Sequence, residues 1–445
     1  MKILKFGGTS VGSAERMKAV AKLITDGEEK IVVLSAMSGT TNHLLQMAEY
    51  LRLGNASGAT DLLKQLETKY RLECDGLAID FAVIAQLFKD LRHHCLKPYT
   101  PQVEKDVVSF GELISTTMMT AYMTQQGLDA VLMPALDYMR LNADGEPDLF
   151  ETERLLREQL NVLGEHTYII TQGFICRNTS GQIDNLQRGG SDYTASIVGA
   201  LLDAQEIQIW TDIDGMHNND PRYVEGTLPV RNLSFDEAAE LAYFGAKILH
   251  PTCILPAKMH NVPVRLLNTL DPTAPGTYIS NQTSAGSIKA VAAKDGIYAV
   301  RVQSGRMLMA YGFLSRVFAI FEKYRTAIDL ITTSEVAVSM SVDNPAQLDA
   351  IVSELRTLGT VSVESNMTII SVVGDFRPDN RGLESSVVAS MNGIPVRMIS
   401  YGGSERNISL LVASQHKIPA LQALSHTLFN SPLNPKRYGH RSLPR

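Results

Sequence analysis

Short apolar runs alternate with longer amphipathic stretches up to about residue 280. The run Lys30–Ser35 is apolar at its central positions, which is typical of a strand in a parallel sheet covered by helices on both faces. Further strands are predicted at Ala130–Met133, Tyr168–Ile175, Ile207–Thr211 and Val262–Leu267. Apolar residues at helical spacing predict helices at Val103–Gln125, Tyr193–Ala204 and Phe235–Leu249, with peripheral helices over residues 52–100. This alternation predicts an α/β layered sandwich with a mainly parallel sheet.

The turn after the first predicted strand is the most informative segment of the chain about its function. The apolar strand Lys2–Phe6 runs into Gly7–Ser10, and the helix that follows can be capped by Ser13. Glycines let a backbone approach an anion closely, while helix N–H groups and the Lys5 ammonium supply positive potential. We expect a nucleotide phosphate to bind here, although an ordinary tight turn has the same features. The Rossmann glycine pattern and the Walker A lysine are both absent, so those two classes lose support.

The pattern changes at Ser280–Ser287, a run of small polar residues that is typical of a linker between domains. Beyond it, strands are predicted at Tyr298–Gln303, Ala327–Ile331, Val336–Val342, Val361–Glu364, Thr368–Val373, Val396–Ser400 and Ile408–Val412. Helices are predicted at Gly312–Tyr324, Gln347–Leu358, Leu383–Met391 and Pro419–Phe429. Two tandem βαββαβ-like units of this kind suggest a regulatory pair, although they could instead brace the first domain or form a dimer interface.

Composition narrows the class of protein. The chain has 445 residues, 44% of them hydrophobic and 20% charged, as expected of a soluble protein with two or three domains. A net charge of −6 without a basic block argues against a nucleic-acid partner. No apolar run approaches the ~20 residues that cross a bilayer, so we expect no membrane partner and a cytoplasmic protein. The four cysteines form no C-x-x-C pair and His93 and His94 lack partners, which predicts reduced thiols and no protein metal site.

Three further clusters could join the first turn at the carboxyl ends of the parallel strands. Ser35–Asn42 is rich in hydroxyl side chains and suits a carboxylate or phosphate, or equally a helix cap. Glu112 lies in the middle of a helix among small side chains, where a cationic ligand could approach, although an exposed glutamate is the commoner explanation. In Gln187–Thr194, Arg188 can clamp a carboxylate through two hydrogen bonds and Asp192 can orient lysines or a metal.

Two more segments complete the candidate chemistry. Trp210–Gly215 ends a strand in a turn with two carboxylates, and Lys247 is either a second phosphate-binding ammonium or a surface lysine near a helix end. Together the clusters offer cations for phosphates, an arginine for a carboxylate and a glutamate for an ammonium group. These are the requirements for phosphorylating an amino acid. A carboxylate nucleophile needs no general base, so catalysis would rest on alignment and on charge neutralisation by Lys5, Lys247 and Mg²⁺.

Four segments resemble the motifs of aspartate kinase in order and spacing: Lys5–Ser10, Arg188–Asp192, Trp210–Asp212 and Phe244–Pro251. The resemblance covers nearly the whole chain. It implies an amino-acid-kinase domain over residues 1–285, an αβα sandwich, followed by two tandem ACT domains over residues 295–375 and 376–445. It also implies transfer of a phosphoryl group from ATP to the side chain of L-aspartate. This reaction gives 4-phospho-L-aspartate, the first step of lysine, threonine and methionine biosynthesis.

The same resemblance assigns roles to individual residues. Lys5 and Lys247 stabilise the phosphates, Asp192 organises the lysines, and ATP and Mg²⁺ are the cofactors. The residues that hold the substrate L-aspartate are Ser35, Thr41, Glu112 and Arg188. The residues that bind the nucleotide are Lys5, Gly7, Gly8, Thr9, Ser10, Thr211, Asp212, His217, Arg222, Lys247 and Ile248.

The C-terminal half resembles the lysine-sensitive subgroup, which implies an allosteric amino-acid site. Its expected residues are Met307, Gly312, Phe313, Leu314, Asp329, Thr333 and Ser334. The Asp329 carboxylate could bind the effector at one end and backbone groups around Gly312 at the other. Lysine is the expected inhibitor, with threonine or both together left open. The resemblance also implies a homodimer or homotetramer formed through the ACT domains, and the chain has no room for a homoserine dehydrogenase half.

Three positions depart from the family pattern, and two other functions stay open. Gln187 stands where many relatives have glycine, His217 where they often have tyrosine, and Met309 where the subgroup has histidine. The chain could be another kinase of this fold, such as glutamate 5-kinase, but Glu112 and Arg188 favour a free amino acid over UMP. It could also be an amino-acid sensor with an inactive kinase-like domain, which the retained lysines and Asp192 disfavour.

Overall fold

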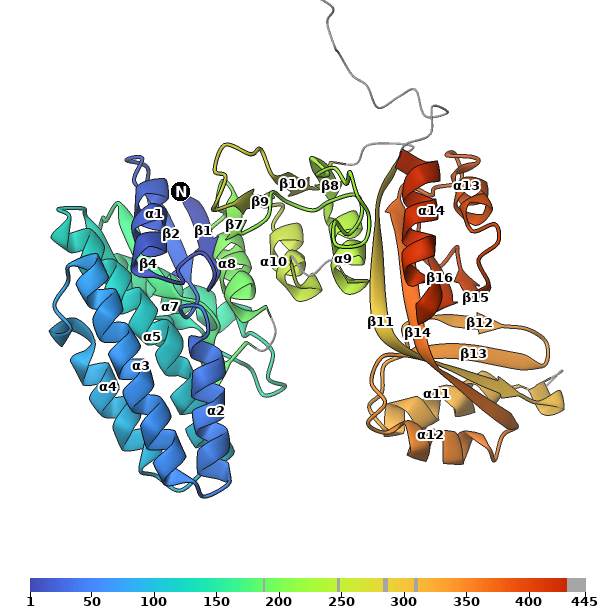
Figure 1. Ribbon diagram of the computed structural model, residues 1–445, viewed down its shortest axis with the longest axis horizontal. Helices are drawn as coiled ribbons and strands as arrows, with labels where there is room; N and C mark the ends of the chain where they lie inside the picture. The colour runs from blue at the N-terminus through green and yellow to red at the C-terminus, as the bar shows by residue number, and fades with distance from the viewer. Residues whose placement is uncertain (187–188, 246–248, 283–286, 308–310, 430–445) are drawn as a thin grey trace, which may run out of the picture. The chain divides into compact units, whose positions relative to one another are not determined.

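The computed structural model describes residues 1–186, 189–245, 249–282, 287–307 and 311–429. The chain forms two compact units (Figure 1). The first comprises Met1–Met216 and Ile248–Asn281, and the second comprises His217–Lys247 and Gln282–Arg445. Within the described ranges, no helix is both long and apolar enough to cross a membrane.

The first unit is built on a mainly parallel sheet in which the strands run in the order β3-β4-β2-β1-β7-β9-β10. The strands are β1 (Lys2–Phe6), β2 (Lys30–Leu34), β3 (Ala130–Met133), β4 (Tyr168–Gln172), β7 (Ile207–Thr211), β9 (Val264–Asn268) and the antiparallel β10 (Thr277–Ser280). Every residue of β2 and β4 is buried, which explains their continuous apolar sequences. Lys5 of β1 pairs in register with Val33 of β2 and Ile209 of β7, so the carboxyl ends of these strands lie at one edge.

Helices pack on this sheet, and a short hairpin of β5 (Ile175–Arg177) and β6 (Ile183–Asn185) follows β4. The helices are α1 (Ala14–Ile24), α2 (Thr40–Arg52), α3 (Ala56–Leu77), α4 (Ala82–Cys95), α5 (Pro101–Gln125), α6 (Ala135–Tyr138), α7 (Leu149–Leu163), α8 (Gly190–Leu201), the 3₁₀ helix η1 (Pro251–Cys253) and α10 (Ile254–Met259). Helix α5 contacts α2, α4 and the strands β3 and β4, and it is buried on most of its circumference (Figure 1). Four polar residues in its middle are therefore buried: Ser109, Glu112, Ser115 and Thr116.

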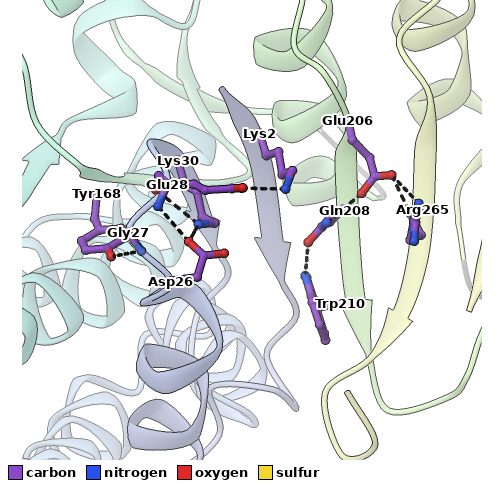
Figure 2. Close-up of polar contacts among 10 residues, drawn as sticks. All are labelled: Lys2, Asp26, Gly27, Glu28, Lys30, Tyr168, Glu206, Gln208, Trp210 and Arg265. Carbon is purple, nitrogen blue, oxygen red and sulfur yellow. Dashed lines mark hydrogen bonds and ion pairs between the residues drawn. The ribbon is translucent and has the colours of Figure 1, made fainter. Parts of the chain in front are cut away.

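Polar contacts hold the amino ends of the strands (Figure 2). Lys2, at the start of β1, pairs with Glu28 at 2.6 Å, and the buried Lys30, at the start of β2, pairs with Asp26. Figure 2 also shows the contacts of Gly27 with Tyr168, of Gln208 with Glu206 and Trp210, and of Arg265 with Glu206. The contacts of Lys2 and Lys30 secure strand order at the end of the sheet opposite to Lys5.

The second unit contains an antiparallel sheet in the order β12-β13-β11-β14-β16-β15. Its strands are β11 (Ile288–Gln303), β12 (Ile331–Thr333), β13 (Ala337–Val342), β14 (Thr360–Gly374), β15 (Val396–Ser400) and β16 (Asn407–Ala413). The other elements are β8 (Asn232–Ser234), α9 (Phe235–Tyr243), η2 (Gly305–Met307), α11 (Phe313–Lys323), α12 (Leu348–Leu355), α13 (Leu383–Ser390), η3 (Ser414–His416) and α14 (Lys417–Phe429). The long strands β11 and β14 pair along most of their lengths (Figure 1).

Two hydrophobic cores share these long strands. One core joins Val300 and Val302 of β11 to α11 and α12, and the other joins Val291 of β11 and Ile370 of β14 to α14. Each long strand therefore contributes one half to each core. The division into two ACT domains at residues 295–375 and 376–445 stays a proposal. The strand pairing shows in addition that Ile288–Lys294, at the start of β11, belongs with the second core.

The α/β class is confirmed, and several predicted boundaries are wrong. The strand predicted at Ala327–Ile331 lies at Ile331–Thr333 instead. The strand starting at Tyr168 ends at Gln172 because Phe174 adopts a left-handed backbone with φ of 69°. The helix that begins at Phe235 is capped by Ser234 as predicted. It ends at Tyr243 and not at Leu249, because Gly245 turns the chain at a φ of 116°. The strands predicted at Val361–Glu364 and Thr368–Val373 are one strand, β14.

Candidate active site

A cavity of about 510 Å³ opens at the carboxyl ends of β1 and β2. Its lining comes from the turn after β1, the turn after β2, the middle of α5 and the start of α8. The predicted site residues in this lining are Lys5, Gly8, Thr9, Ser35, Thr41, Glu112 and Asp192. Segments far apart in the sequence therefore meet around one space, as expected at the carboxyl edge of a parallel sheet.

Lys5 and Asp192 form an ion pair on the wall of this cavity. The distance from Lys5 Nζ to Asp192 Oδ1 is 2.6 Å, and the two side chains are 12% and 14% exposed. Lys5 is the fourth residue of β1 and Asp192 lies in the first turn of α8, which packs against β1. The carboxylate thus fixes the lysine ammonium at the cavity rather than leaving it on the open surface.

The glycine turn after β1 approaches the turn after β2 very closely. A Cβ atom on Gly8 would lie 2.8 Å from the carbonyl oxygen of Ala36, which is shorter than real Cβ contacts. A Cβ atom on Gly7 would lie 3.5 Å from Lys5 Nζ. Gly8 is therefore needed for packing between the two turns, whereas a Cβ on Gly7 would make an ordinary contact.

Glu112 is buried and lies beside the turn after β2. Its Oε1 accepts a hydrogen bond from the Ala36 N–H at 3.1 Å, and its Oε2 has no hydrogen-bond partner among the described residues. Burial raises the pKa of Glu112 to about 8, although the bond from Ala36 acts in the opposite direction. The Ser115 hydroxyl on the same helix donates to the Ser35 carbonyl at 2.8 Å and holds the turn against α5. The commoner explanation of an exposed glutamate is wrong here.

Two helices begin at the cavity without a side-chain cap. The residues before α2 and α8 are Gly39 and Gly189, and neither supplies a capping side chain. In contrast, Ser13, Thr100 and Asp148 cap α1, α5 and α7 through their side chains. The uncapped N–H groups of α2 and α8 remain available to an anionic ligand, and the helix dipoles favour negative charge there.

Sequence reasoning missed Phe174, which lies between β4 and β5 in the chain and lines the cavity. Its backbone has φ of 69°, an unfavourable conformation for a phenylalanine, and its N–H donates to the Thr194 hydroxyl at 3.0 Å. Strained residues of this kind are often found at functional sites. The preceding Gly173 was the only available sign of a break, and it does not identify which residue adopts the strained conformation.

Several predicted nucleotide residues of the first unit lie outside the cavity lining. Ser10 is buried and its hydroxyl is 2.7 Å from that of Thr269. Thr211 is the last residue of β7 and Asp212 follows it, and the Thr211 hydroxyl donates to the Asp212 carboxylate at 3.1 Å. These three positions therefore lie in the turn after β1, which carries Lys5, and at the end of the neighbouring strand β7.

The remaining nucleotide residues fall in the second unit or outside the described residues. His217 Nδ1 is 2.9 Å from the Thr227 hydroxyl, and Arg222 pairs with Asp220 at 2.6 Å. The predicted residues outside the described ranges are Gln187, Arg188, Lys247, Ile248 and Met309.

The residues predicted for the allosteric site are not gathered in one described cavity. Asp329 is almost fully buried and paired with Lys294 at 2.7 Å. Thr333 and Ser334 line a separate cavity of about 200 Å³ that also contacts Arg301 and Glu364. Gly312 precedes α11, and three predicted residues pack in or against the hydrophobic core beneath that helix: Met307, Phe313 and Leu314.

Comparison with known proteins agrees with this architecture. Residues 1–268 match the amino acid kinase family, and residues 370–428 match an ACT domain. Chloroplastic aspartokinase 3 of Arabidopsis thaliana is 36% identical over 462 residues, which cover 96% of this chain and 82% of that protein. Lysine-sensitive aspartokinase 3 of Escherichia coli is 32% identical over 450 residues, which cover 96% of this chain and 99% of that protein.

Solved structures of Escherichia coli aspartokinase III have the same fold. Its complex with aspartate and ADP (R-state) aligns with a TM-score of 0.82 at 32% identity, covering 96% of this chain and 100% of that chain. Its complex with lysine and aspartate (T-state) aligns with a TM-score of 0.77 at 32% identity, covering 96% and 99%. The resemblance found in the sequence motifs is thereby confirmed over nearly the full length. The chain belongs to the aspartokinase family, the enzymes that phosphorylate L-aspartate with ATP.

Proposed function

We propose that the 510 Å³ cavity is where this aspartokinase transfers the γ-phosphoryl group of ATP to the side-chain carboxylate of L-aspartate. One observation carries the proposal: the cavity presents complementary charges for both substrates. Lys5, fixed by Asp192 at 2.6 Å, offers a cation to phosphate. Glu112 offers a buried carboxylate oxygen that has no partner among the described residues.

Glu112 binds the ammonium group of aspartate in this proposal. The substrate then supplies the cation that Oε2 lacks, and burial strengthens the attraction because little water competes. Ser35 and Thr41, which line the same cavity near the start of α2, hold the substrate carboxylates together with Arg188. The role of Arg188 rests on the family resemblance.

Lys5 and the backbone N–H groups of Gly8 and Thr9 bind the phosphates, together with Lys247. The N–H groups of Gly7 and Ser10 already donate to the carbonyls of Trp210 and Gly7. Mg²⁺ enters with ATP and neutralises phosphate charge. Such an ion needs only one or two protein carboxylates, since phosphate and water oxygens complete its coordination, and Asp192 on the cavity wall meets this need. The family resemblance assigns the other nucleotide contacts to Thr211, Asp212, His217, Arg222 and Ile248.

The chemical step requires alignment rather than proton transfer. An oxygen of the aspartate side chain attacks the γ-phosphorus, and the bond from that phosphorus to the oxygen of the leaving ADP breaks. The attacking carboxylate is already ionised at neutral pH, so no general base is needed. Lys5 and the uncapped helix ends would neutralise charge on the transferring group.

Turnover with aspartate, glutamate and N-acetylglutamate, measured by coupled ADP release, tests this assignment. We expect kcat/KM for aspartate to exceed the others by about 100-fold, because a wrong substrate leaves buried polar groups unpaired. Glu112→Gln should raise KM for aspartate at least about tenfold, whereas Glu104→Gln on the same helix should not. Equal turnover of either alternative substrate, or an unchanged KM in Glu112→Gln, would reject the assignment.

We also propose feedback inhibition by an end-product amino acid, with lysine as the leading candidate and threonine, or both together, as the alternative. Support comes from the ACT match at residues 370–428, from the lysine-sensitive Escherichia coli relative, and from the solved lysine complex of aspartokinase III. The enzyme would then act at the first step of lysine, threonine and methionine biosynthesis, as a homodimer or homotetramer. The division into a kinase domain over residues 1–285 and two ACT domains belongs to this proposal.

Activity assays with each amino acid test the regulatory proposal. Millimolar lysine should lower aspartate turnover, and Asp329→Ala should weaken that inhibition because it removes the carboxylate expected to bind the effector. Inhibition by threonine alone would reassign the effector. Unchanged inhibition by lysine in Asp329→Ala would move the site away from Asp329, and light scattering of the same samples would give the oligomeric state.

A further inference from the structure

Asp329 lies in a polar network within the second unit. Its Oδ1 accepts hydrogen bonds from the Tyr243 hydroxyl at 2.8 Å and from Lys294 Nζ at 2.7 Å. Lys294 also pairs with Asp343 at 2.9 Å, and its ammonium lies 4.5 Å from the centre of the Tyr243 ring. The Asp329 side chain is 2% exposed, and its Oδ2 has no hydrogen-bond partner among the described residues. One carboxylate oxygen thus accepts two hydrogen bonds, while the other is buried without a hydrogen-bond partner among the described residues.

Both donors in this network keep their protons at neutral pH. Burial raises the pKa of Tyr243, and the hydrogen bond to Asp329 raises it further. Burial lowers the pKa of Lys294, but the bonds to Asp329 and Asp343 outweigh this effect and leave it raised. Asp329 is therefore held by a neutral phenol and a charged ammonium.

Tyr243 is the last residue of α9, and the chain beyond it lies directly against β11. A Cβ atom on Gly245 would lie 2.1 Å from the carbonyl oxygen of Ala293, the residue before Lys294. Only glycine allows this contact, at a φ of 116°. Lys247, which the family resemblance assigns to the phosphates, follows two residues later in the sequence.

The rest of this segment is held by the other half of the second unit. Glu240, one turn before Tyr243, accepts hydrogen bonds from the Ser404 hydroxyl at 2.8 Å and from the Asn407 amide. Asn219 donates to the carbonyl of Leu421 on α14 at 3.1 Å. Of these contacts, the one made by Tyr243 reaches a residue expected to bind the effector.

Resting on the proposed function, we propose that the Tyr243 hydroxyl is a positioning group that couples effector binding at Asp329 to the segment carrying Arg222 and Lys247. An effector ammonium that reaches the buried, unpartnered Oδ2 draws the carboxylate away from the Tyr243 hydroxyl. The Tyr243 phenol, which is 42% exposed, then loses its carboxylate acceptor, so the end of α9 is no longer held to Asp329. The effector thereby releases the end of α9, which precedes Lys247 in the sequence.

Tyr243→Phe tests this coupling, because it removes the hydroxyl and keeps the ring. The lysine Kd is measured with and without saturating aspartate and a non-hydrolysable ATP analogue, and the ratio of the two is the coupling factor. We expect the coupling factor to fall at least about fivefold, with the lysine Kd of the free protein changed less than about threefold. Basal kcat and KM should stay near those of the unaltered protein. L-Threonine is used as a second probe.

Tyr401→Phe is the matched control, since it removes the hydroxyl of an exposed tyrosine in the same unit and should leave the coupling factor unchanged. An unchanged coupling factor in Tyr243→Phe would overturn the inference. So would a weaker lysine Kd with unaltered coupling, because Tyr243 would then be part of the binding site only. An unaltered protein that phosphorylates aspartate but responds to neither amino acid would overturn the inference alone. One that does not phosphorylate aspartate would overturn the proposed function instead.

Discussion

Among single residues, Glu112 has the most unusual environment. Its carboxyl group is buried on a helix that is packed on most sides, and a backbone N–H is the partner found for it outside its own helix. The free protein therefore favours the neutral form up to about pH 8. A bound ammonium group would favour the ionised form, so substrate binding and ionisation of Glu112 are linked.

This linkage predicts a pH dependence with a definite sign. Because the pKa of Glu112 is raised to about 8, kcat/KM for aspartate should increase about tenfold per pH unit between about pH 6 and pH 8 and level off above that. Glu112→Gln cannot ionise and should be less active with a flat profile over the same range. Initial rates at sub-saturating aspartate provide the measurement. A flat profile in the unaltered protein would show that Glu112 does not control substrate binding.

The sequence places Lys5 and Asp192 at the edge of the sheet where they form an ion pair, but it does not reveal the buried environment of Glu112. Lys5 lies near the end of a strand and Asp192 lies in the first turn of a helix, and the local sequence pattern is enough to predict both positions. The burial of Glu112 depends on α2, α4 and the sheet packing around α5, which the polar residues near Glu112 do not indicate. Phe174 was missed for a similar reason, because its backbone conformation is imposed by neighbours such as Thr194.

At the scale of elements, two loops depend on close backbone contact. Gly8→Ala should lower kcat/KM by about 10- to 100-fold, because the new Cβ would meet the Ala36 carbonyl at 2.8 Å and shift both turns. Gly403→Ala is the control, since a Cβ there meets nothing within 4 Å. Steady-state kinetics and thermal melting of both variants provide the comparison. Full activity in Gly8→Ala would show that the two turns do not set the geometry of the site.

The amino ends of β1 and β2 make a separate prediction about stability. Asp26→Ala should reduce the free energy of unfolding by about 1–3 kcal/mol, because the buried Lys30 ammonium loses its charged partner. Lys30→Met should cost less than Asp26→Ala, since an apolar chain of similar length needs no partner. Denaturant unfolding gives both values. The reverse order would mean that the Lys30 ammonium is satisfied without Asp26.

Element positions were predictable where local pattern and packing agree. The strands at Ala130–Met133, Ile207–Thr211 and Val396–Ser400 have the predicted bounds. The boundary of α9 was wrong because Gly245 must fit against β11, a contact between segments almost fifty residues apart. The strand β14 was divided in the prediction because its central residues are polar. Its pairing with β11 continues on both sides of this point, although the register shifts there and Asn366 has φ of 57°.

At the scale of the whole molecule, compact units and chain order do not coincide. The segment His217–Lys247 belongs to the second unit although it precedes the last part of the first one. This segment contains residues assigned to the nucleotide by family resemblance, and its α9 contacts a residue assigned to the effector. Such an arrangement would give the proposed regulation a physical route, because the same segment contacts the residue expected to bind the effector.

The central claim is that Lys5, held by Asp192, neutralises the transferring phosphoryl group. The most direct test is the rate of aspartyl phosphate formation, trapped with hydroxylamine, in Lys5→Met and in Lys2→Met. Both variants remove a lysine from β1, but Lys2 pairs with Glu28 at the opposite end of the strand. We predict a loss of about 100-fold or more in Lys5→Met with normal folding, and near-normal rates in Lys2→Met. Equal rates in the two variants would contradict the account.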